Sequence, residues 1–561
     1  MLFSLHIPEL IISFILICFY EPVLVKCADP IVSISTGQIK GVQKTVQGVK
    51  LNVFYNIPYA EPPIGDNRFR KPIPITKKSN EVYKAVRNSR VCYSMPAKYL
   101  AITSPFKVNE TEDCLILNIW SPADLSSDQL KPVLVYIHGG AFILDGARDP
   151  RISDGELLSA LGDFVVVLVR YRLGVFGCLF TNSDEAPGNL PLEDQALALE
   201  WISDNIKYFG GDPSRITLSG ESAGSISVAL QFMRQKNRPL FQQMILQSGA
   251  TKTSLNEDIG AALIRSGKIS KFLGCSPDES INHLSKPEIL SCLRSATPES
   301  LMEAYMSEET EHSSVHGAPR CLVDTGEFSQ ADADRRLLSG SFPSGFPILV
   351  TTLVDEGSVI LAHMRYDKSK GFREALKTTV NRLHSSEAVK LTDETYFSGL
   401  LDNLNSFDAE KATVHALGDL FIRCPSIWFA EKTMDTNTVY TLEYTYASPI
   451  FSSMEPQLIF NSNFGPRHGL DLLYVFGTPL LLKKKVTEED VIQTEQIISI
   501  WKQFVHSGKL NWSPYIRQSH TGKILPHQLE VNPTKQINST KFDERYFHCE
   551  IWKQIVYGND F

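Results

Sequence analysis

One serine stands in a setting that favours covalent chemistry. Residues 220–224 read Gly-Glu-Ser-Ala-Gly, after the strand-like segment 216–218 and before the helical segment 225–233. In that context the G-x-S-x-G spacing predicts a nucleophile elbow, because only small neighbours let the strand and helix pack so closely. The turn would raise the Ser222 hydroxyl at the helix N-terminus, where the dipole and the Ala223 amide favour negative charge. The alternative is a glycine-rich turn that only packs.

A serine nucleophile also needs hydrogen-bond donors for the oxyanion formed during attack on a carbonyl. Residues 138–142 read His-Gly-Gly-Ala-Phe and directly follow the apolar segment 132–137. Glycines there would let backbone amides approach a substrate closely. We assign the donors to the amides of Gly140 and Ala141, joined by that of Ala223. A tight turn without this role is the alternative.

The serine further needs a base and an acid, which follow it along the chain in this kind of arrangement. Asp355 and Glu356 come directly after the strand-like segment 348–352, where a loop at the top of a sheet would lie. His468 lies in the glycine-bracketed segment 465–469. The residues offer His468 as a candidate base, with a surface or structural histidine as the alternative, and leave Asp355 and Glu356 as competing acids.

Strand-like and helical patterns alternate along the chain. Unbroken apolar runs predict buried strands, and periodic apolar residues predict helices. The expected strands are 132–137, 164–169, 216–218, 244–246, 348–350 and 439–444, and the expected helices are 192–206, 225–233 and 487–505. This alternation predicts a mostly parallel central sheet covered by helices. Without a convincing linker, we expect a single large α/β domain with cap insertions, of which 252–334 is one.

Composition excludes several classes of protein. Of the 561 residues, 43% are hydrophobic and 21% charged, which is an ordinary globular mixture. The 55 Lys and Arg residues against 63 Asp and Glu residues give a net charge of −8, so we expect no nucleic-acid partner. No zinc-type C-x-x-C pair, P-loop or G-x-G-x-x-G after a strand occurs. We therefore expect neither a metal nor a cofactor.

The N-terminus predicts a signal peptide. The apolar run 11–20 is too short to span a bilayer but suits the hydrophobic region of a signal, although no Lys or Arg precedes it. The small residues Val25 and Cys27 suit a cleavage site, so we expect a signal peptide at 1–27 and a mature domain at 28–561. A buried strand or an uncleaved anchor is the alternative. With no second spanning run, we expect a secreted, extracellular protein without a stable membrane anchor.

Glycosylation would fit such a compartment. Acceptor sequences of the type N-x-S/T occur at Asn109, Asn511 and Asn538. We expect Asn109 and Asn538 to be used, because Pro514 follows closely after Asn511 and disfavours its modification.

Ten cysteines fit the same compartment. Cys18 and Cys27 would leave with the signal. Pairs 92–114 and 275–292 would close small loops and 424–549 would tie down the C-terminal segment, although sequence alone does not give connectivity. Cys178 and Cys321 are left over, and we expect them to be free, buried thiols.

Seven spaced motifs resemble those of the type-B carboxylesterases, the carboxylesterase/cholinesterase family. They are the segments 57–69, 112–118, 138–140, 209–224, 247–249, 355–358 and 468–469. The resemblance covers nearly the whole mature chain. It implies an α/β-hydrolase fold and a small-molecule ester as substrate, with no cofactor.

The resemblance also implies roles for individual residues. It implies a triad of Ser222, Glu356 and His468, oxyanion donors at Gly140, Ala141 and Ala223, and the disulfides Cys92–Cys114, Cys275–Cys292 and Cys424–Cys549. It further places Ser248 near the acid and makes Glu221 a buried carboxylate beside the nucleophile. The expected function is hydrolysis of carboxylic esters through an acyl-serine intermediate.

Departures from the family pattern narrow the range of expected substrates. Cholinesterases carry a tryptophan between the first pair of cysteines that stacks on the choline ammonium, and this chain has none between Cys92 and Cys114. Val359 and Ile360 stand where cholinesterases place aromatic residues, so choline esters are disfavoured. Arg170 replaces a common asparagine, and Pro191 replaces a common glycine.

Four alternatives remain open. They are a catalytically inactive cholinesterase-like adhesion or binding protein, a cholinesterase, a lipase-like enzyme and a hormone or pheromone esterase. The oligomeric state is not predicted.

Overall fold

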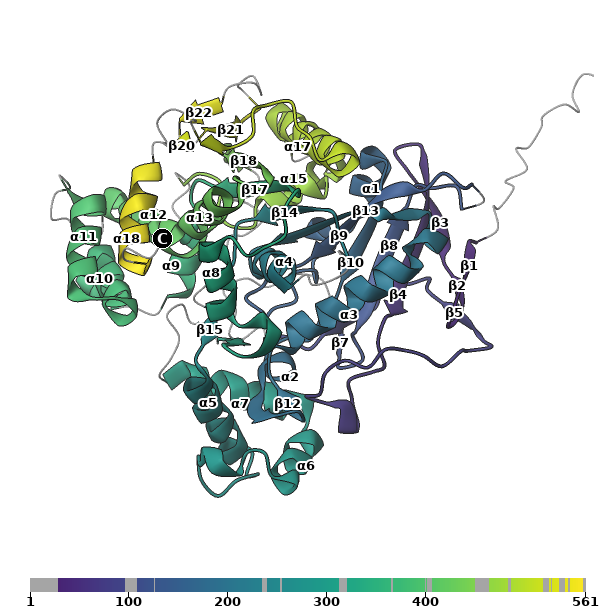
Figure 1. Ribbon diagram of the computed structural model, residues 1–561, viewed down its shortest axis with the longest axis horizontal. Helices are drawn as coiled ribbons and strands as arrows, with labels where there is room; N and C mark the ends of the chain where they lie inside the picture. The colour runs from purple at the N-terminus through teal and green to yellow at the C-terminus, as the bar shows by residue number, and fades with distance from the viewer. Residues whose placement is uncertain are drawn as a thin grey trace, which may run out of the picture.

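An eleven-stranded sheet runs through the centre of the molecule (Figure 1). The computed structural model describes residues 29–561 apart from 96–107, 126, 235–239, 253–254, 312–319, 365–366, 399, 401–405, 450–463, 483–485, 518–523, 526, 534–539, 543–544 and 558–561. The expected signal peptide, 1–27, lies outside the described residues.

The central strands of this sheet are parallel, as the sequence predicts. In spatial order the strands are β22 (Thr540–Phe542), β21 (His527–Val531), β18 (Thr438–Tyr444), β17 (Pro347–Leu353), β14 (Gln243–Gln247), β13 (Gly211–Glu221), β9 (Lys131–Ile137), β10 (Val165–Val169), β8 (Ile116–Ser121), β4 (Val49–Pro58) and β3 (Val42–Val46). Neighbours from β21 to β10 pair in parallel. The outer pairs on both sides are antiparallel.

Helices cover both faces of the sheet, because alternate residues of its central strands are apolar and point to opposite faces. On β9, Val133, Val135 and Ile137 join the core beneath α3 (Leu190–Asn205) and α4 (Ala223–Arg234). Leu134 and Tyr136 join the opposite core, with α1 (Glu156–Gly162), α15 (Asp471–Val475) and α17 (Glu488–Ser507). Figure 1 shows α3 and α4 crossing the front of the sheet. Two packed faces on alternate residues are what a covered parallel sheet requires.

The expected helices form with small shifts at their ends. Thr487 and Asp490 make a capping box at the start of α17. Pro191 lies in the first turn of α3, where a proline loses no helical hydrogen bond. This position explains how the chain accepts proline where a glycine is common.

Two further groups of helices extend from the sheet. One contains α2 (Val175–Cys178), α5 (Ile259–Phe272), α6 (Pro287–Ser295), α7 (Pro298–Glu311) and α8 (Gln330–Ser339), most of it within the predicted insertion 252–334. The other contains α9 (Gly357–His363), α10 (Gly371–Leu383), α11 (Ser386–Phe397), α12 (Phe407–Gly418), the π-helical turn Asp419–Arg423, α13 (Cys424–Thr433) and α18 (Tyr546–Tyr557). In Figure 1, α10, α11 and α18 lie together on the side away from β3.

Four disulfides join cysteines in the described part of the chain. Three are the expected pairs, Cys92–Cys114, Cys275–Cys292 and Cys424–Cys549. The prediction of free thiols at Cys178 and Cys321 is wrong, because these two residues form the fourth disulfide. They are 143 residues apart in sequence, yet their Cα atoms lie 4.8 Å apart, so only the packing of α2 against the segment beside β16 (Leu322–Val323) reveals the pair.

This fourth disulfide should contribute strongly to stability. We expect replacement of both Cys178 and Cys321 by alanine to lower the free energy of unfolding by about 4–5 kcal/mol, because the bond closes a long loop in the unfolded chain. The matched control replaces Cys275 and Cys292, which close a loop of 17 residues, and should cost about 3 kcal/mol. Urea unfolding without reductant measures both. Titratable thiols in the unfolded parent protein would contradict the pairing.

Candidate active site

Ser222 occupies the turn between β13 and α4 with a left-handed backbone. Its φ is 55°, a backbone conformation that residues other than glycine rarely adopt. A Cβ at Gly224 would overlap the Ile137 carbonyl, and one at Gly220 would overlap the Gly224 backbone. The glycines therefore permit the close strand–helix packing that the G-x-S-x-G pattern predicts, and Ser222 remains partly exposed.

Neighbouring backbone groups hold this turn in place. The Ser222 amide donates to the Gln247 carbonyl at 2.8 Å, and the Ser222 carbonyl accepts from the Ile226 amide at 2.9 Å. Ala223 is the first residue of α4, so its amide has no acceptor within the helix. That amide is available to an anion beside the Ser222 hydroxyl.

The glycine-rich segment after β9 turns sharply through three left-handed residues. Gly140, Ala141 and Phe142 have φ values of 111°, 52° and 62°. The Gly140 carbonyl accepts from the Ile143 amide at 2.9 Å and the Leu144 amide at 2.8 Å. Because β9 and β13 are parallel neighbours, this segment and the elbow emerge at the same edge of the sheet.

The structure separates the two competing acids. His468 Nδ1 lies 2.7 Å from Glu356 Oε2. The other oxygen of Glu356 accepts from the Ser248 hydroxyl at 2.7 Å and the Leu353 amide at 2.9 Å. The hydrogen bonds to one oxygen thus fix the buried Glu356 carboxylate, and its other oxygen contacts the imidazole. Glu356 rather than Asp355 therefore faces His468.

Asp355 instead joins the two loops that carry Glu356 and His468. Its amide donates to the Pro466 carbonyl at 3.1 Å, and its carboxylate accepts from the Gly465 amide. The same carboxylate lies 3.0 Å from His415 Nε2 on α12. These contacts fix the His468 loop beside the end of β17.

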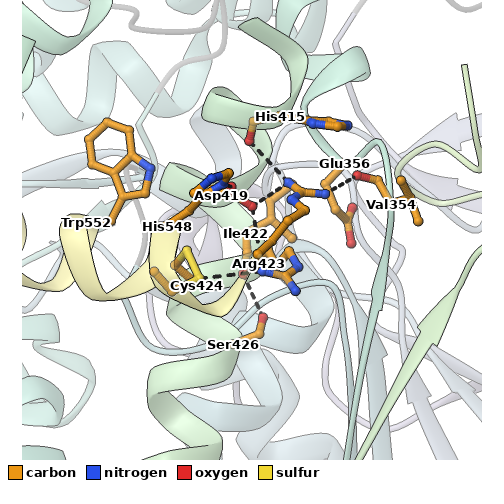
Figure 2. Close-up of polar contacts among 12 residues, drawn as sticks. Val354, Glu356, His415, Asp419, Ile422, Arg423, Cys424, Ser426, His548 and Trp552 are labelled. Carbon is orange, nitrogen blue, oxygen red and sulfur yellow. Dashed lines mark hydrogen bonds and ion pairs between the residues drawn. A yellow bond between two sulfur atoms is a disulfide. The ribbon is translucent and has the colours of Figure 1, made fainter. Parts of the chain in front are cut away.

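A network of ion pairs centred on the buried Asp419 supports the strand end before Glu356 (Figure 2). Arg545 lies 2.5 Å from Asp419 and donates to the Val354 carbonyl at 2.8 Å. Asp419 also lies 3.3 Å from His548 on α18, and the Cys424–Cys549 disulfide ties α18 to α13. The C-terminal helix therefore stabilises the strand end that precedes Glu356.

A family model described as the carboxylesterase family matches residues 28–547. The chain belongs to the carboxylesterase family. Its fold is accordingly the α/β-hydrolase fold that the sequence motifs imply.

Three curated relatives are similar over most of their length. They are acetylcholinesterase-1 of Trittame loki, 28% identical over 540 residues covering 93% of this chain and 94% of the relative; the acetylcholinesterase of Bungarus fasciatus, 32% identical over 500 residues covering 85% and 78%; and the cholinesterase of Mus musculus, 30% identical over 507 residues covering 86% and 79%.

A cluster of buried acids surrounds His468 in this carboxylesterase-family protein. His468 Nε2 lies 3.3 Å from Glu221 Oε1, and Asp471 accepts a hydrogen bond from Gln247 at 2.7 Å. Burial alone would lower the pKa of His468, but Glu221 and Glu356 outweigh it and raise that pKa to about 9. Burial raises the pKa of Glu221 and of Asp471. The cluster therefore favours a proton on the imidazole.

Asp471 is the member that sequence analysis missed. It lies in the first turn of α15, three residues after His468, and is fully buried. A single aspartate at a helix start is usually a capping residue at the surface, so the sequence contains no signal for this burial.

The remaining predicted sites are only partly described. Asn109 is exposed, as an acceptor for glycosylation must be, and Asn538 lies outside the described residues. Within the ranges that the structure covers, no cluster of His, Cys, Asp and Glu could hold a metal ion, and no helix is long and apolar enough to cross a membrane.

Proposed function

We propose that this chain is a secreted serine hydrolase that cleaves carboxylic esters of small molecules through an acyl-serine intermediate. The observation that carries the proposal is the contact of His468 with Glu356 on one nitrogen while its other nitrogen faces Glu221, the residue directly before Ser222. Membership of the carboxylesterase family supports ester hydrolysis in general.

In the proposed reaction, the Ser222 oxygen attacks the ester carbonyl while His468 accepts its proton. Glu356 orients the imidazole and stabilises its charged form. The amides of Gly140, Ala141 and Ala223 bind the oxyanion. His468 then protonates the departing alcohol. A water attacks the acyl-serine while His468 again accepts a proton, and His468 returns this proton to the Ser222 oxygen as the acyl–oxygen bond breaks and the carboxylic acid leaves.

The preferred substrate in this proposal is an uncharged ester rather than a choline ester. The relatives named as cholinesterases make choline esters the obvious rival. The segment between Cys92 and Cys114 has no tryptophan to stack on an ammonium group. Val359 and Ile360 on α9 present aliphatic rather than aromatic surface.

Secretion completes the proposal, with a signal peptide at 1–27, a mature domain at 28–561 and glycosylation at Asn109 and Asn538. Four disulfides support a chain that matures in an oxidising compartment.

The experiment that tests the function compares a nitrophenyl ester with a choline ester on the purified, disulfide-bonded protein. We expect faster turnover of the nitrophenyl ester, and an active-site phosphonate should label the peptide that contains Ser222, as located by mass spectrometry. Failure to hydrolyse any small ester, together with no phosphonate label, would favour a binding protein without catalysis. Faster turnover of the choline ester would contradict the substrate preference alone.

The acid cluster predicts a particular pH dependence. The base His468 must be neutral to accept a proton, so kcat/KM should rise with pH through a pKa above the ordinary histidine value. Glu221→Gln removes a negative neighbour and should move this limb to lower pH, because less charge then favours the protonated imidazole. The control is His415→Gln, which alters another partly buried histidine that also contacts a carboxylate. A limb that stays in place in Glu221→Gln contradicts the prediction.

A further inference from the structure

Arg170 and Asp145 form an ion pair that is buried behind the glycine-rich segment 138–147, hereafter the oxyanion loop. Their side chains are 2% and 0% exposed. We propose that Arg170 is a positioning residue that holds the oxyanion loop in its reactive shape through Asp145 and Ala147. This inference rests on the proposed function, in which amides of the loop bind the oxyanion.

The position of Arg170 in the sheet lets it act on this loop. Arg170 follows β10, whose last residue, Val169, pairs in parallel with Ile137, the last residue of β9. The oxyanion loop begins immediately after Ile137. The Arg170 amide donates to the Ile116 carbonyl at 3.1 Å, and its carbonyl accepts from the Tyr59 hydroxyl at 2.8 Å. The backbone of Arg170 is thus fixed by β8 and by the residue that follows β4.

The guanidinium of Arg170 holds the far end of the loop. One of its nitrogens contacts the Asp145 carboxylate, and another donates to the Ala147 carbonyl at 3.1 Å. Asp145 also accepts from the Ala147 amide at 2.9 Å. A planar group with several donors can make these contacts at once, whereas asparagine is too short to reach both.

The near end of the loop is held by the residue after Arg170. Tyr171 stacks on the His138 ring with centroids 4.4 Å apart and donates to the His138 carbonyl at 2.6 Å. The Gly146 amide donates to His138 Nδ1 at 3.2 Å. Both ends of the loop therefore depend on consecutive residues at the end of β10.

Between these two anchors lie the left-handed residues Gly140, Ala141 and Phe142. Left-handed backbone at Ala141 and Phe142 is unfavourable and persists only where surrounding contacts hold it. Arg170 also keeps the pKa of Asp145 low in spite of its burial, so the carboxylate stays charged and the pair stays closed. Loss of Arg170 would release the loop and leave the buried Asp145 carboxylate without the guanidinium that balances its charge.

The test compares Arg170→Asn and Arg170→Lys with the parent, using kcat per site titrated by a phosphonate. We expect Arg170→Asn to lower kcat about 100-fold, as the loss of one oxyanion donor does, with KM changed less than about threefold because ground-state binding does not need the oxyanion contacts. Affinity for a trifluoromethyl ketone, which mimics the tetrahedral state, should fall in parallel. Arg170→Lys, which keeps the charge but not both bonds, should lose about tenfold.

A matched control separates positioning from general stability. Lys553→Gln leaves the buried Glu431 carboxylate on α13 without its partner at 2.7 Å, so it should lower the unfolding temperature while kcat per titrated site stays unchanged. If Arg170→Asn is not secreted, the same measurements of kcat per titrated site and ketone affinity are made on Arg170→Lys.

Two outcomes overturn the inference. One is an Arg170 variant whose kcat per titrated site and ketone affinity both match the parent. The other is a loss that Lys553→Gln reproduces. An inactive parent protein would instead refute the proposed function, and the inference would fail with it.

Discussion

Ser222→Ala should lower kcat for a nitrophenyl ester by about 10⁶-fold, because the reaction loses the atom that forms the acyl intermediate. Activity of about 10³-fold above water should remain, since the oxyanion amides and the binding surface persist. Stopped assays on concentrated, purified protein can measure so large a loss, provided that the preparation contains no other esterase.

The matched control for this variant is Ser225→Ala. Ser225 lies in the first turn of α4, is fully buried and donates to the Gly249 carbonyl at 2.7 Å. Its loss removes a hydroxyl of the same kind without removing a nucleophile, so kcat should stay within about tenfold of the parent. Equal phosphonate labelling of Ser222→Ala and the parent would show that another residue is the nucleophile.

Glu356→Gln should lower kcat by about 10⁴-fold, the scale seen when a triad acid loses its charge. The amide retains the size of the carboxylate but can present its NH₂ group to His468 Nδ1, which favours the wrong tautomer. The imidazolium formed during attack would also lose the negative partner that lies 2.7 Å away. The pH limb of kcat/KM should move to lower pH, because Glu356 raises the pKa of His468.

Asp355→Asn is the matched control, since Asp355 and Glu356 are adjacent and are both 1% exposed. Asp355 contacts the Gly465 amide and His415 but not His468, so its loss should lower the unfolding temperature and reduce kcat by less than about tenfold. The reverse ranking, with Asp355→Asn the more damaging to kcat per titrated site, would reassign the acid.

Local sterics made the elbow and the central strands predictable. The strand, the two glycines and the helix lie within a few residues of Ser222, and their packing leaves few conformations for the turn. Unbroken apolar runs likewise identified β9 and β10, because strands covered on both faces must be apolar at every position. The edge strand β3 escaped prediction, since none of its residues is fully buried and an antiparallel strand at an edge leaves a weaker apolar pattern.

Residues alone left the acid open, and they gave a wrong prediction for the two remaining cysteines. Asp355 and Glu356 follow the same strand with the same chemistry, and only the loop that carries His468 distinguishes them. Cys178 and Cys321 are separated by 143 residues, and nothing in their immediate surroundings indicates a partner.

The amino-acid sequence by itself determined the tight turn at Ser222, the parallel sheet and the family, because each depends on contacts between near neighbours or on ordered motifs. Only the tertiary structure decided which cysteines form the fourth disulfide and why Arg170 is buried beside Asp145. It also showed that Glu356, the acid that the family resemblance implies, faces His468. The physical reason is that these partners are far apart in the sequence and come into contact only when the chain folds. The pattern of residues around each of them does not indicate which distant residue it will contact.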